Sequence, residues 1–404
     1  MKISVNKMLA VAMLVFCFST LTYSFWPPIN RILAILIIAA LGFNFIKRIN
    51  GKEIMMLLGM ACVFVSGLLV TEDMVQNIED WLYWAVTCML LLLMSRKDFA
   101  ARLAKEVFSL KKFMLWIIVL SNIALLAAFF IPESYTRTNV GTYFRGFAYS
   151  QHSVCCGSCL LLVLILLYYK GRHASITQIL LMLPASVAIL DSGARTFLLS
   201  LVVIWLVFYR DFVKSQSTRI LLFPAALIVL VYAFLNSGMM DKFINTSANV
   251  YISEDTMTAM SSGRLDFWKL DLEAYQDLGF FPKLLGMGFD YVYKINQEGY
   301  GMRIWAHNDI INLLLSAGLV GLALYLGVFA SLFKKIIRTR YNVFGKILLI
   351  LYITFPMLFN GVFIYQHYLY SFVLLFLYCT HREDAGTNVA EAVPHRQIDE
   401  RRTV

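Results

Sequence analysis

The residues best suited to chemistry in this sequence are a histidine and a few arginines beside strongly apolar stretches. His307 lies in Ala306-His307-Asn308-Asp309, where a long apolar run begins. Imidazole is the side chain that most readily exchanges a proton near neutral pH, so His307 is a candidate general base. A lone histidine at such a boundary is more often structural. Whether His307 is catalytic or structural therefore depends on the residues and elements around it.

Two arginines are candidate anion ligands. Arg195 lies in a short connection between two apolar runs, and Arg264 follows Gly263 where a helical pattern begins. The guanidinium group is always charged, and its planar fork fits phosphate oxygens. The first turn of a helix adds free backbone N–H groups, which favours an anion beside Arg264. The alternatives are an ion pair between Arg195 and Asp191 and an ordinary surface position for Arg264.

Three further residues are candidate substrate contacts. Arg145 opens a segment, 145–152, that interleaves glycine and aromatic residues and ends at His152. Such a segment suits a sugar site, but an aromatic belt at a membrane interface explains it equally well. Arg303 and Asn308 flank His307 in sequence. Asn308 or Asp309 is also placed to cap the helix that follows.

The composition shows which elements must position these side chains. The chain has 404 residues, of which 60% are hydrophobic and 15% charged, and this excludes an ordinary soluble domain. Helices of about 20 apolar residues cross a membrane, so the apolar runs predict an all-α polytopic membrane protein with about twelve transmembrane helices. The predicted spans are 8–25, 31–46, 54–70, 79–94, 113–131, 153–169, 175–190, 196–209, 220–236, 308–332, 345–362 and 366–380.

The distribution of charge predicts the orientation. The net charge of +10 would by itself allow nucleic acid as a partner, but most of the 35 Lys and Arg residues fall in alternate short loops and the two termini. By the positive-inside rule these segments are cytoplasmic, and the loop 237–306 is periplasmic. The first apolar run lacks a small-residue cleavage site, so we interpret it as an uncleaved span. No nucleic-acid partner is expected.

This orientation divides the chain into four parts. Transmembrane helices fill 1–236, the large periplasmic loop fills 237–306, three further spans fill 307–380, and 381–404 form a polar, disordered cytoplasmic tail. Within the loop, Leu265, Trp268, Leu272 and Tyr275 share one helical face. We expect that helix to lie in the membrane interface, or alternatively to form a small soluble cap. Glycines at 286 and 288 predict a turn.

Cysteine usage gives a weaker signal. Cys155, Cys156 and Cys159 cluster at the start of a predicted span. They lack the second half of a ligand set, so buried thiols are favoured over a metal or redox site. We expect no metal site and no cofactor.

The pattern around His307 resembles a known signature. His307-Asn308, nine residues, Gly318, two residues and Gly321 are similar to the motif shared by bacterial O-antigen ligases and Wzy-type O-antigen or exopolysaccharide polymerases. The large loop before the histidine, Arg264, Arg195 and the step Leu285-Gly286-Met287-Gly288 also match. The likeness covers roughly residues 190–325, and glycines at 318 and 321 are expected to allow close helix packing.

The resemblance implies an activity. Members of this superfamily transfer a glycan from undecaprenyl pyrophosphate to an acceptor hydroxyl at the periplasmic face, without metal or nucleotide sugar. Their fold is related to the GT-C glycosyltransferases. By this resemblance, Arg195 and Arg264 bind the donor pyrophosphate, His307 activates the acceptor for inverting attack at the anomeric carbon, and Arg145 is an accessory contact.

The member of the superfamily is left open. A polymerase passes the glycan to another lipid-linked unit, and a chain-length regulator is then a possible partner, whereas a ligase passes it to lipid A–core. Residues 145–152 resemble a stretch of some exopolysaccharide polymerases, although Ser153-Val154 replace its Pro-Asn. We favour a polymerase over a ligase. A polysaccharide flippase or transporter is the non-enzymatic alternative, but such proteins usually carry ionisable groups in mid-span.

Overall fold

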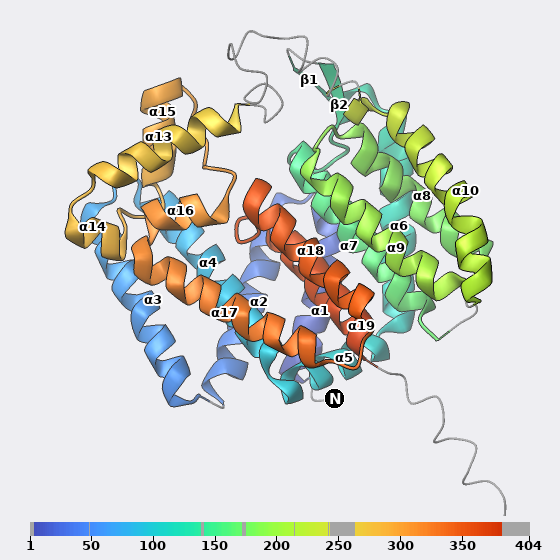
Figure 1. The fold of residues 1–404 in the computed structure, drawn as a ribbon, viewed down its shortest axis with the longest axis horizontal. Coiled ribbons are helices and arrows are strands. Elements are labelled where there is room, and N and C mark those ends of the chain that lie inside the picture. The colour runs from blue at the N-terminus through green and yellow to red at the C-terminus, as the bar shows by residue number, and fades with distance from the viewer. Residues whose placement is uncertain are drawn as a thin grey trace, which may run out of the picture.

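The computed structural model describes residues 4–47, 49–138, 141–171, 175–213, 215–240, 242 and 263–381. Within these ranges the chain is helical apart from one short strand pair (Figure 1), which agrees with the predicted all-α class. The predicted tail from Arg382 and the part of the predicted loop at 243–262 lie outside the described residues.

The apolar runs form the expected helices. In the described chain six helices are long and apolar enough to cross a membrane. They are α2 (Pro27–Ile46), α3 (Gly51–Val70), α4 (Met74–Ser95), α6 (Lys111–Phe129), α7 (Gln151–Tyr169) and α17 (Gly318–Arg338). Shorter apolar helices are α1 (Val5–Leu21), α8 (Ile176–Asp191) and α18 (Val343–Phe359). The remaining predicted spans fall on α9 (Thr196–Phe212), α10 (Gln216–Leu235) and α19 (Gln366–Thr380).

The predicted span 308–332 is wrong as a single helix. It is split into α16 (Asp309–Ser316) and α17 because Gly318 has a φ of +62°. A Cβ at Gly318 would lie 2.5 Å from the carbonyl carbon of Leu284, so backbone meets backbone there. Gly286, at φ +83°, approaches Ser316 from the other side in the same way. These two glycines therefore allow residues 284–286 to pack closely against the break between α16 and α17.

The loop before His307 is ordered by three helices. They are α13 (Arg264–Asp277), α14 (Phe280–Leu285) and α15 (Tyr291–Tyr300). Val292 and Ile295 form a small core with residues of α16, against which Trp268 and Tyr275 pack. Leu265 and Leu272 are exposed instead, so only half of the predicted apolar face points inward. We call α13–α16 the cap.

Two further elements had no sequence signal that we used. Helix α5 (Lys97–Ser109) occupies the stretch between two predicted spans, where the sequence predicts a basic loop. Strands β1 (Tyr135–Thr138) and β2 (Gly141–Phe144) form an antiparallel hairpin after a short 3-10 turn, Pro132–Ser134. The centre of the bundle is α7, which is buried along nearly its whole length and packs against α1, α8 and α19. Cys155, Cys156 and Cys159 are buried in this helix as free thiols.

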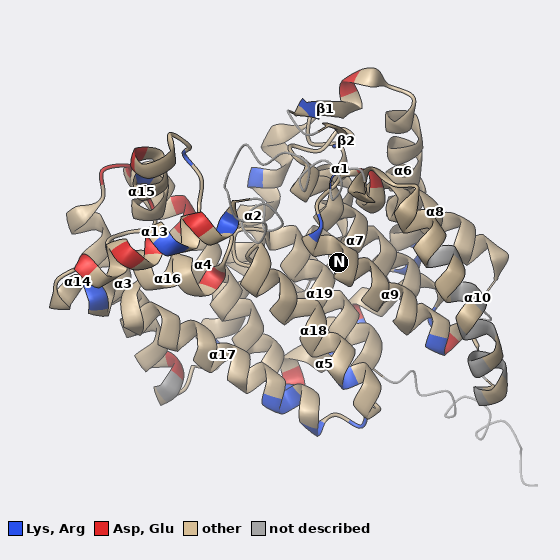
Figure 2. Ribbon diagram, turned by 45° about the horizontal axis from the view of Figure 1, so that its top comes forward, with Lys and Arg blue, Asp and Glu red and all other residues tan. Residues whose placement is uncertain are grey.

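The two ends of the bundle differ in charge. Figure 2 shows acidic residues concentrated on the cap and basic residues at the far ends of α5 and α17. Helices α4 and α17 each run between these ends, about 30 Å at 1.5 Å per residue. Ser4 donates to Glu106 of α5, and Lys170 donates to the carbonyl oxygen of His381, so both ends of the described chain lie at the basic end. That the basic end faces the cytoplasm stays a prediction.

Candidate functional site

His307 lies between α15 and α16 at the acidic end. It is the one non-glycine residue of the described chain with a positive φ, +53°, a conformation that side chains other than glycine adopt rarely. Its side chain is 9% exposed and lies between rings: the centroid of Trp305 is 4.7 Å away and that of His152 is 5.9 Å away. Among the described residues, Nδ1 of His307 has no hydrogen-bond partner. Unusual backbone and an unpaired buried nitrogen are typical of a functional position.

The residues around His307 hold it in place. Asn308 accepts hydrogen bonds from the N–H groups of Ile310 (2.9 Å) and Ile311 (3.3 Å), so its side chain caps α16. Of the two predicted caps, Asn308 and Asp309, it is Asn308 that caps the helix. On the other side, the indole of Trp268 donates to the carbonyl oxygen of Ala306 at 2.7 Å. The histidine is therefore fixed by the helix that follows it and by α13 of the cap.

Asp309 links this helix start to the turn between α18 and α19. Its carboxylate is fully buried and accepts hydrogen bonds from the Tyr325 hydroxyl (2.5 Å) and the Val362 N–H (2.9 Å). Gly361, in the same turn, has a φ of +100°, and a Cβ there would lie 2.2 Å from the ring of Trp305. The turn can approach His307 only because residue 361 is glycine.

Arg264 and Arg195 meet at the start of α9. Nη1 of Arg264, the first residue of α13, donates to the carbonyl oxygen of Phe359 and lies 3.4 Å from the hydroxyl of Thr196. The adjacent Arg195 donates to the carbonyl oxygen of Lys242 at 2.9 Å. The two predicted anion ligands thus come from segments 69 positions apart and share one neighbourhood. Lys242 joins them, and we call these three residues the cationic cluster.

The pKa values of the cationic cluster are lowered by burial and by the repulsion between its positive charges. Burial, together with Arg195 and Arg264, lowers the pKa of Lys242 to about 8. Burial and Arg195 lower the pKa of Arg264 to about 10, although Tyr365 opposes that shift. Burial likewise lowers the pKa of Arg195. An anion bound among these groups would relieve the repulsion, so the cluster is an electrostatic site for negative charge.

His307 belongs to the same electrostatic unit. Burial, then Arg264 and His152, lower the pKa of His307 well below its ordinary value, and Asn360 opposes the shift. The imidazole is therefore neutral near pH 7 and has a free nitrogen to accept a proton. A neutral imidazole close to the charge of Arg264 could accept a proton from a hydroxyl held next to a bound anion.

The other predicted contacts have separate places. The Arg145 guanidinium lies 3.4 Å from the carbonyl oxygen of Glu133, after the β-hairpin. Its strand neighbour Tyr143 lies under Lys242, with 5.1 Å from the ammonium to the ring centroid. Arg303 donates to Asp73 at 2.5 Å on the half-exposed outer side of the cap. The structure thus brings Arg195, Arg264 and His307 together, whereas Arg145 and Arg303 contact other groups.

Several residues of the site escaped the sequence analysis. Tyr365 stacks at 5.7 Å between centroids on His152, the last residue of the predicted segment 145–152, and Asn360 lies beside His307. Asn360 and Tyr365 occur in the connection between the last two apolar runs, where polar groups at a membrane boundary were a usable signal. Lys242 had no such signal, because it is one of several basic residues spread through the loop.

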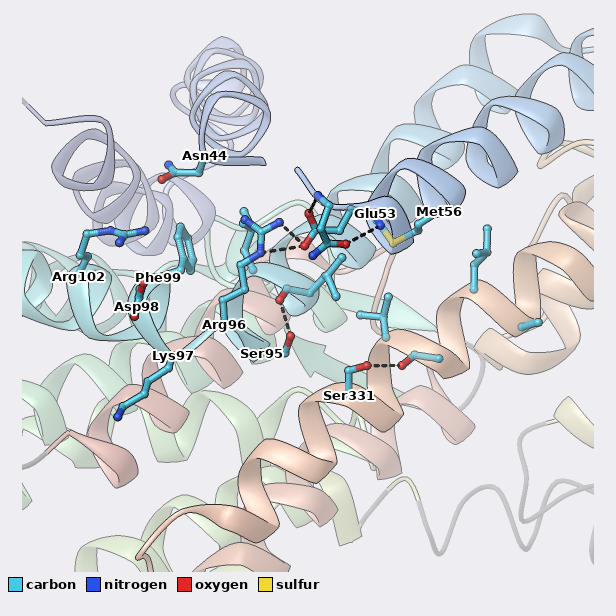
Figure 3. Close-up of a pocket in the computed structure, with 17 residues that line it drawn as sticks. Asn44, Glu53, Met56, Ser95, Arg96, Lys97, Asp98, Phe99, Arg102 and Ser331 are labelled. Atoms are coloured by element: carbon cyan, nitrogen blue, oxygen red, sulfur yellow. Dashed lines mark hydrogen bonds and ion pairs between the residues drawn. The ribbon is translucent and has the colours of Figure 1, made fainter. Parts of the chain in front are cut away.

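A prominent cavity at the other end of the bundle has a different character. Figure 3 shows its lining, in which Arg96 bonds to Glu53. Glu53 is 4% exposed and also completes the capping box of α3 with Asn50. This ion pair fastens α3 to the start of α5 at the basic end, far from His307. We interpret it as structural.

One family model matches a part of the chain. Residues 179–326 match the family model described as O-Antigen ligase, and the match includes Arg195, Arg264 and His307. No curated protein matches the chain. The matched segment is less than half of the chain; it supports a similarity to the superfamily of O-antigen ligases and Wzy-type polymerases, and together with the apolar helices it implies a multi-pass bacterial membrane protein.

Proposed function

We propose that the protein is a glycan polymerase of the bacterial inner membrane. It transfers oligosaccharide repeat units from undecaprenyl pyrophosphate to a hydroxyl of another lipid-linked unit, at the periplasmic face and without a metal. The observation that supports this most strongly is the buried cationic cluster beside a neutral, strained His307. The family match supports glycan transfer of the ligase or polymerase type.

Each group has a place in the reaction. The acceptor oxygen attacks the anomeric carbon while the bond from that carbon to the pyrophosphate oxygen breaks, which inverts the configuration. Nδ1 of His307 takes the proton of the acceptor hydroxyl, because it is the buried, unpaired nitrogen. The departing pyrophosphate gains negative charge, which Arg195, Arg264 and Lys242 stabilise. The products are the lengthened glycan and undecaprenyl pyrophosphate, and the proton then leaves His307 for solvent.

The orientation supports a periplasmic site. Both ends of the described chain and the basic connections lie at one end of the bundle, and His307 lies at the other. With the basic end in the cytoplasm, the cap covers the site on the periplasmic side. A GT-C-like ancestry is part of this proposal.

A ligase is the second candidate, favoured by the description of the matching family as O-Antigen ligase. Deletion of the gene followed by analysis of surface glycans separates the two. A single repeat on lipid A–core indicates a lost polymerase, whereas long carrier-linked chains absent from lipid A–core indicate a lost ligase. Unchanged surface glycans would contradict both. Complementation with His307→Ala should fail at normal protein level, and complementation with wild type should succeed.

A further inference from the structure

A second cavity lies at the same end of the bundle as His307, outside the segment that matches the family model. It has a volume of about 530 Å³ and is bounded by the outer ends of α1, α2, α4, α7 and α19. This volume is within the range of about 300–1,000 Å³ of small-molecule sites. Neither the cationic cluster nor His307 lines it, so the proposed transfer chemistry leaves it unexplained.

The cavity has the lining of a sugar site. Aromatic rings from Phe16, Tyr23, Tyr83, Tyr149 and Tyr370 offer flat faces on which the C–H face of a pyranose packs. Three buried polar atoms of residues that line the cavity lack a hydrogen-bond partner in the described chain: Oδ1 of Asn30, Oγ1 of Thr20 and Nε2 of His367. Unpaired buried polar atoms are costly unless something binds them. Sugar hydroxyls both donate and accept, which matches this mixed set.

Along α2 the polar residues that line the cavity come before the apolar ones. Along α2, Asn30 and Arg31 come first, and Ala34, Ile35 and Ile38 follow over about 12 Å at 1.5 Å per residue. Ile35 is 65% exposed, so the cavity opens on the lipid-facing side of α2. Phe25 and Trp26, exposed just before α2, are typical of the membrane interface. This gradient fits a molecule with a saccharide head and a lipid tail.

A row of rings joins the cavity to the candidate site. His307 stacks with His152 (5.9 Å between centroids), and His152 stacks with Tyr365 (5.7 Å). Tyr365 contacts His367 (6.0 Å), which lines the cavity and stacks with Phe16 (6.3 Å). Residues 149 and 153, on either side of His152, also line it. The wall between the cavity and His307 is therefore about two side chains thick.

From these observations we infer that this cavity binds the lipid-borne saccharide acceptor, with its saccharide end beside the row of rings that leads to His307, while the cationic cluster holds the donor. The inference rests on the proposed function, and it assigns the second substrate to a part of the chain outside the segment that matches the family model. The source of the acceptor, a second carrier-linked unit or lipid A–core, is a matter for the experiment.

The test uses two matched substitutions on α2. Ala34 lines the cavity and Ala39 is exposed beyond it, so Ala34→Trp fills the site and Ala39→Trp adds the same bulk outside. Asn30→Ala removes one polar contact without adding volume and covers the case in which Ala34→Trp fails to fold. The purified full-length protein in nanodiscs is titrated with each of two acceptors, a single undecaprenyl-pyrophosphate-linked repeat unit and lipid A–core, against a donor that carries several repeats, and the rate of transfer is measured. Acceptor binding without donor is measured in an Arg264→Ala background, because the first acceptor also carries the pyrophosphate that the cationic cluster is proposed to bind.

We expect Ala34→Trp to raise the acceptor concentration for half-maximal rate and half-maximal binding more than tenfold, in one of the two arms. Asn30→Ala should raise it about fivefold, as loss of one hydrogen bond does. The half-saturating donor concentration should not change, and Ala39→Trp should match wild type. The inference is overturned if the cavity variants bind acceptor like wild type, if neither acceptor binds, or if the donor value moves instead.

The two proposals fail in different ways. Acceptor binding that depends on residue 34, with no transfer by the wild type, removes the proposed function and leaves the cavity as a saccharide site. Transfer that proceeds normally in Ala34→Trp and Asn30→Ala leaves the function and removes the cavity from it.

Discussion

The fork of Arg264 gives the sharpest prediction about how the pyrophosphate is held. Its guanidinium already donates to the carbonyl oxygen of Phe359 and faces Thr196, which fixes its direction. Arg264→Lys keeps one positive charge but cannot make the paired contacts of a planar fork. A hydrogen bond to a charged group contributes about 1.5–3 kcal/mol, and 1.36 kcal/mol is a tenfold change in rate. We therefore expect Arg264→Lys to transfer glycan about 10 to 150 times more slowly.

The larger substitution should cost more without unfolding the protein. Arg264→Ala removes charge as well as contact, so its rate should fall about 10² to 10³-fold, as for loss of one preorganised donor. The carbonyl oxygen of Phe359 would keep a partner, because the hydroxyl of Thr196 lies 3.3 Å away. The melting temperature should therefore change little.

The assay is the initial rate of glycan transfer by purified protein at saturating acceptor, with thermal unfolding measured on the same samples. Lys269, exposed on the same helix, provides the control: Lys269→Ala should stay within about twofold of wild type, since surface substitutions usually change stability by no more than about 0.5 kcal/mol. Equal rates for Arg264→Lys and wild type would refute the paired contact. A large fall in melting temperature for Arg264→Ala would refute its role as a ligand.

Four further predictions follow from the same site. Because Lys242 has a pKa of about 8, the cationic cluster loses a charge as pH rises through about 8, and the rate of transfer should decline there. Lys242→Arg should move that decline to higher pH in a rate–pH profile. A decline at the same pH in this variant would exclude Lys242 as its cause. Because burial lowers the pKa of His307, the rate of transfer should not decline as pH falls to 6.5, and a rate that halves near pH 6.5 would contradict a buried neutral base. The contribution of His307 to the free energy of unfolding should be full above pH 6.5 and be lost as pH falls below it. Gly361→Ala should lower the free energy of unfolding by about 1–3 kcal/mol and slow transfer, since a Cβ would collide with Trp305, and wild-type stability would show that the turn tolerates a side chain. EDTA should leave transfer unchanged because guanidinium and ammonium groups supply the positive charge, whereas a loss restored by added metal would contradict the proposed mechanism.

Local patterns predicted well what depends on neighbouring residues. The apolar runs predicted where the helices lie, and the boundary between loop and helix predicted that Arg264 begins α13 and that Asn308 or Asp309 caps α16. Apolar periodicity and helix capping both depend on residues close together in the chain, so both can be predicted from the sequence alone.

What the sequence could not predict depends on distant segments. The break at Gly318 exists because Leu284 packs against it, and the inward face of α13 is set by α15 and α16 and not by its own apolar stripe. Lys242 enters the site only through folding, since no spacing connects it with His307. The charge of a residue is visible in a sequence, but the partners that shift its pKa are not.

The central claim is that His307 activates an acceptor for glycan transfer and that the protein is not a conduit. The most direct measurement follows radiolabelled undecaprenyl-pyrophosphate-linked repeat units in proteoliposomes that contain either wild-type protein or His307→Ala. We predict that wild type yields lengthened glycan and undecaprenyl pyrophosphate in equal amounts, and that His307→Ala yields neither at equal insertion and stability. Movement of intact carrier-linked glycan across the bilayer with no transfer, or full transfer by His307→Ala, would contradict the account.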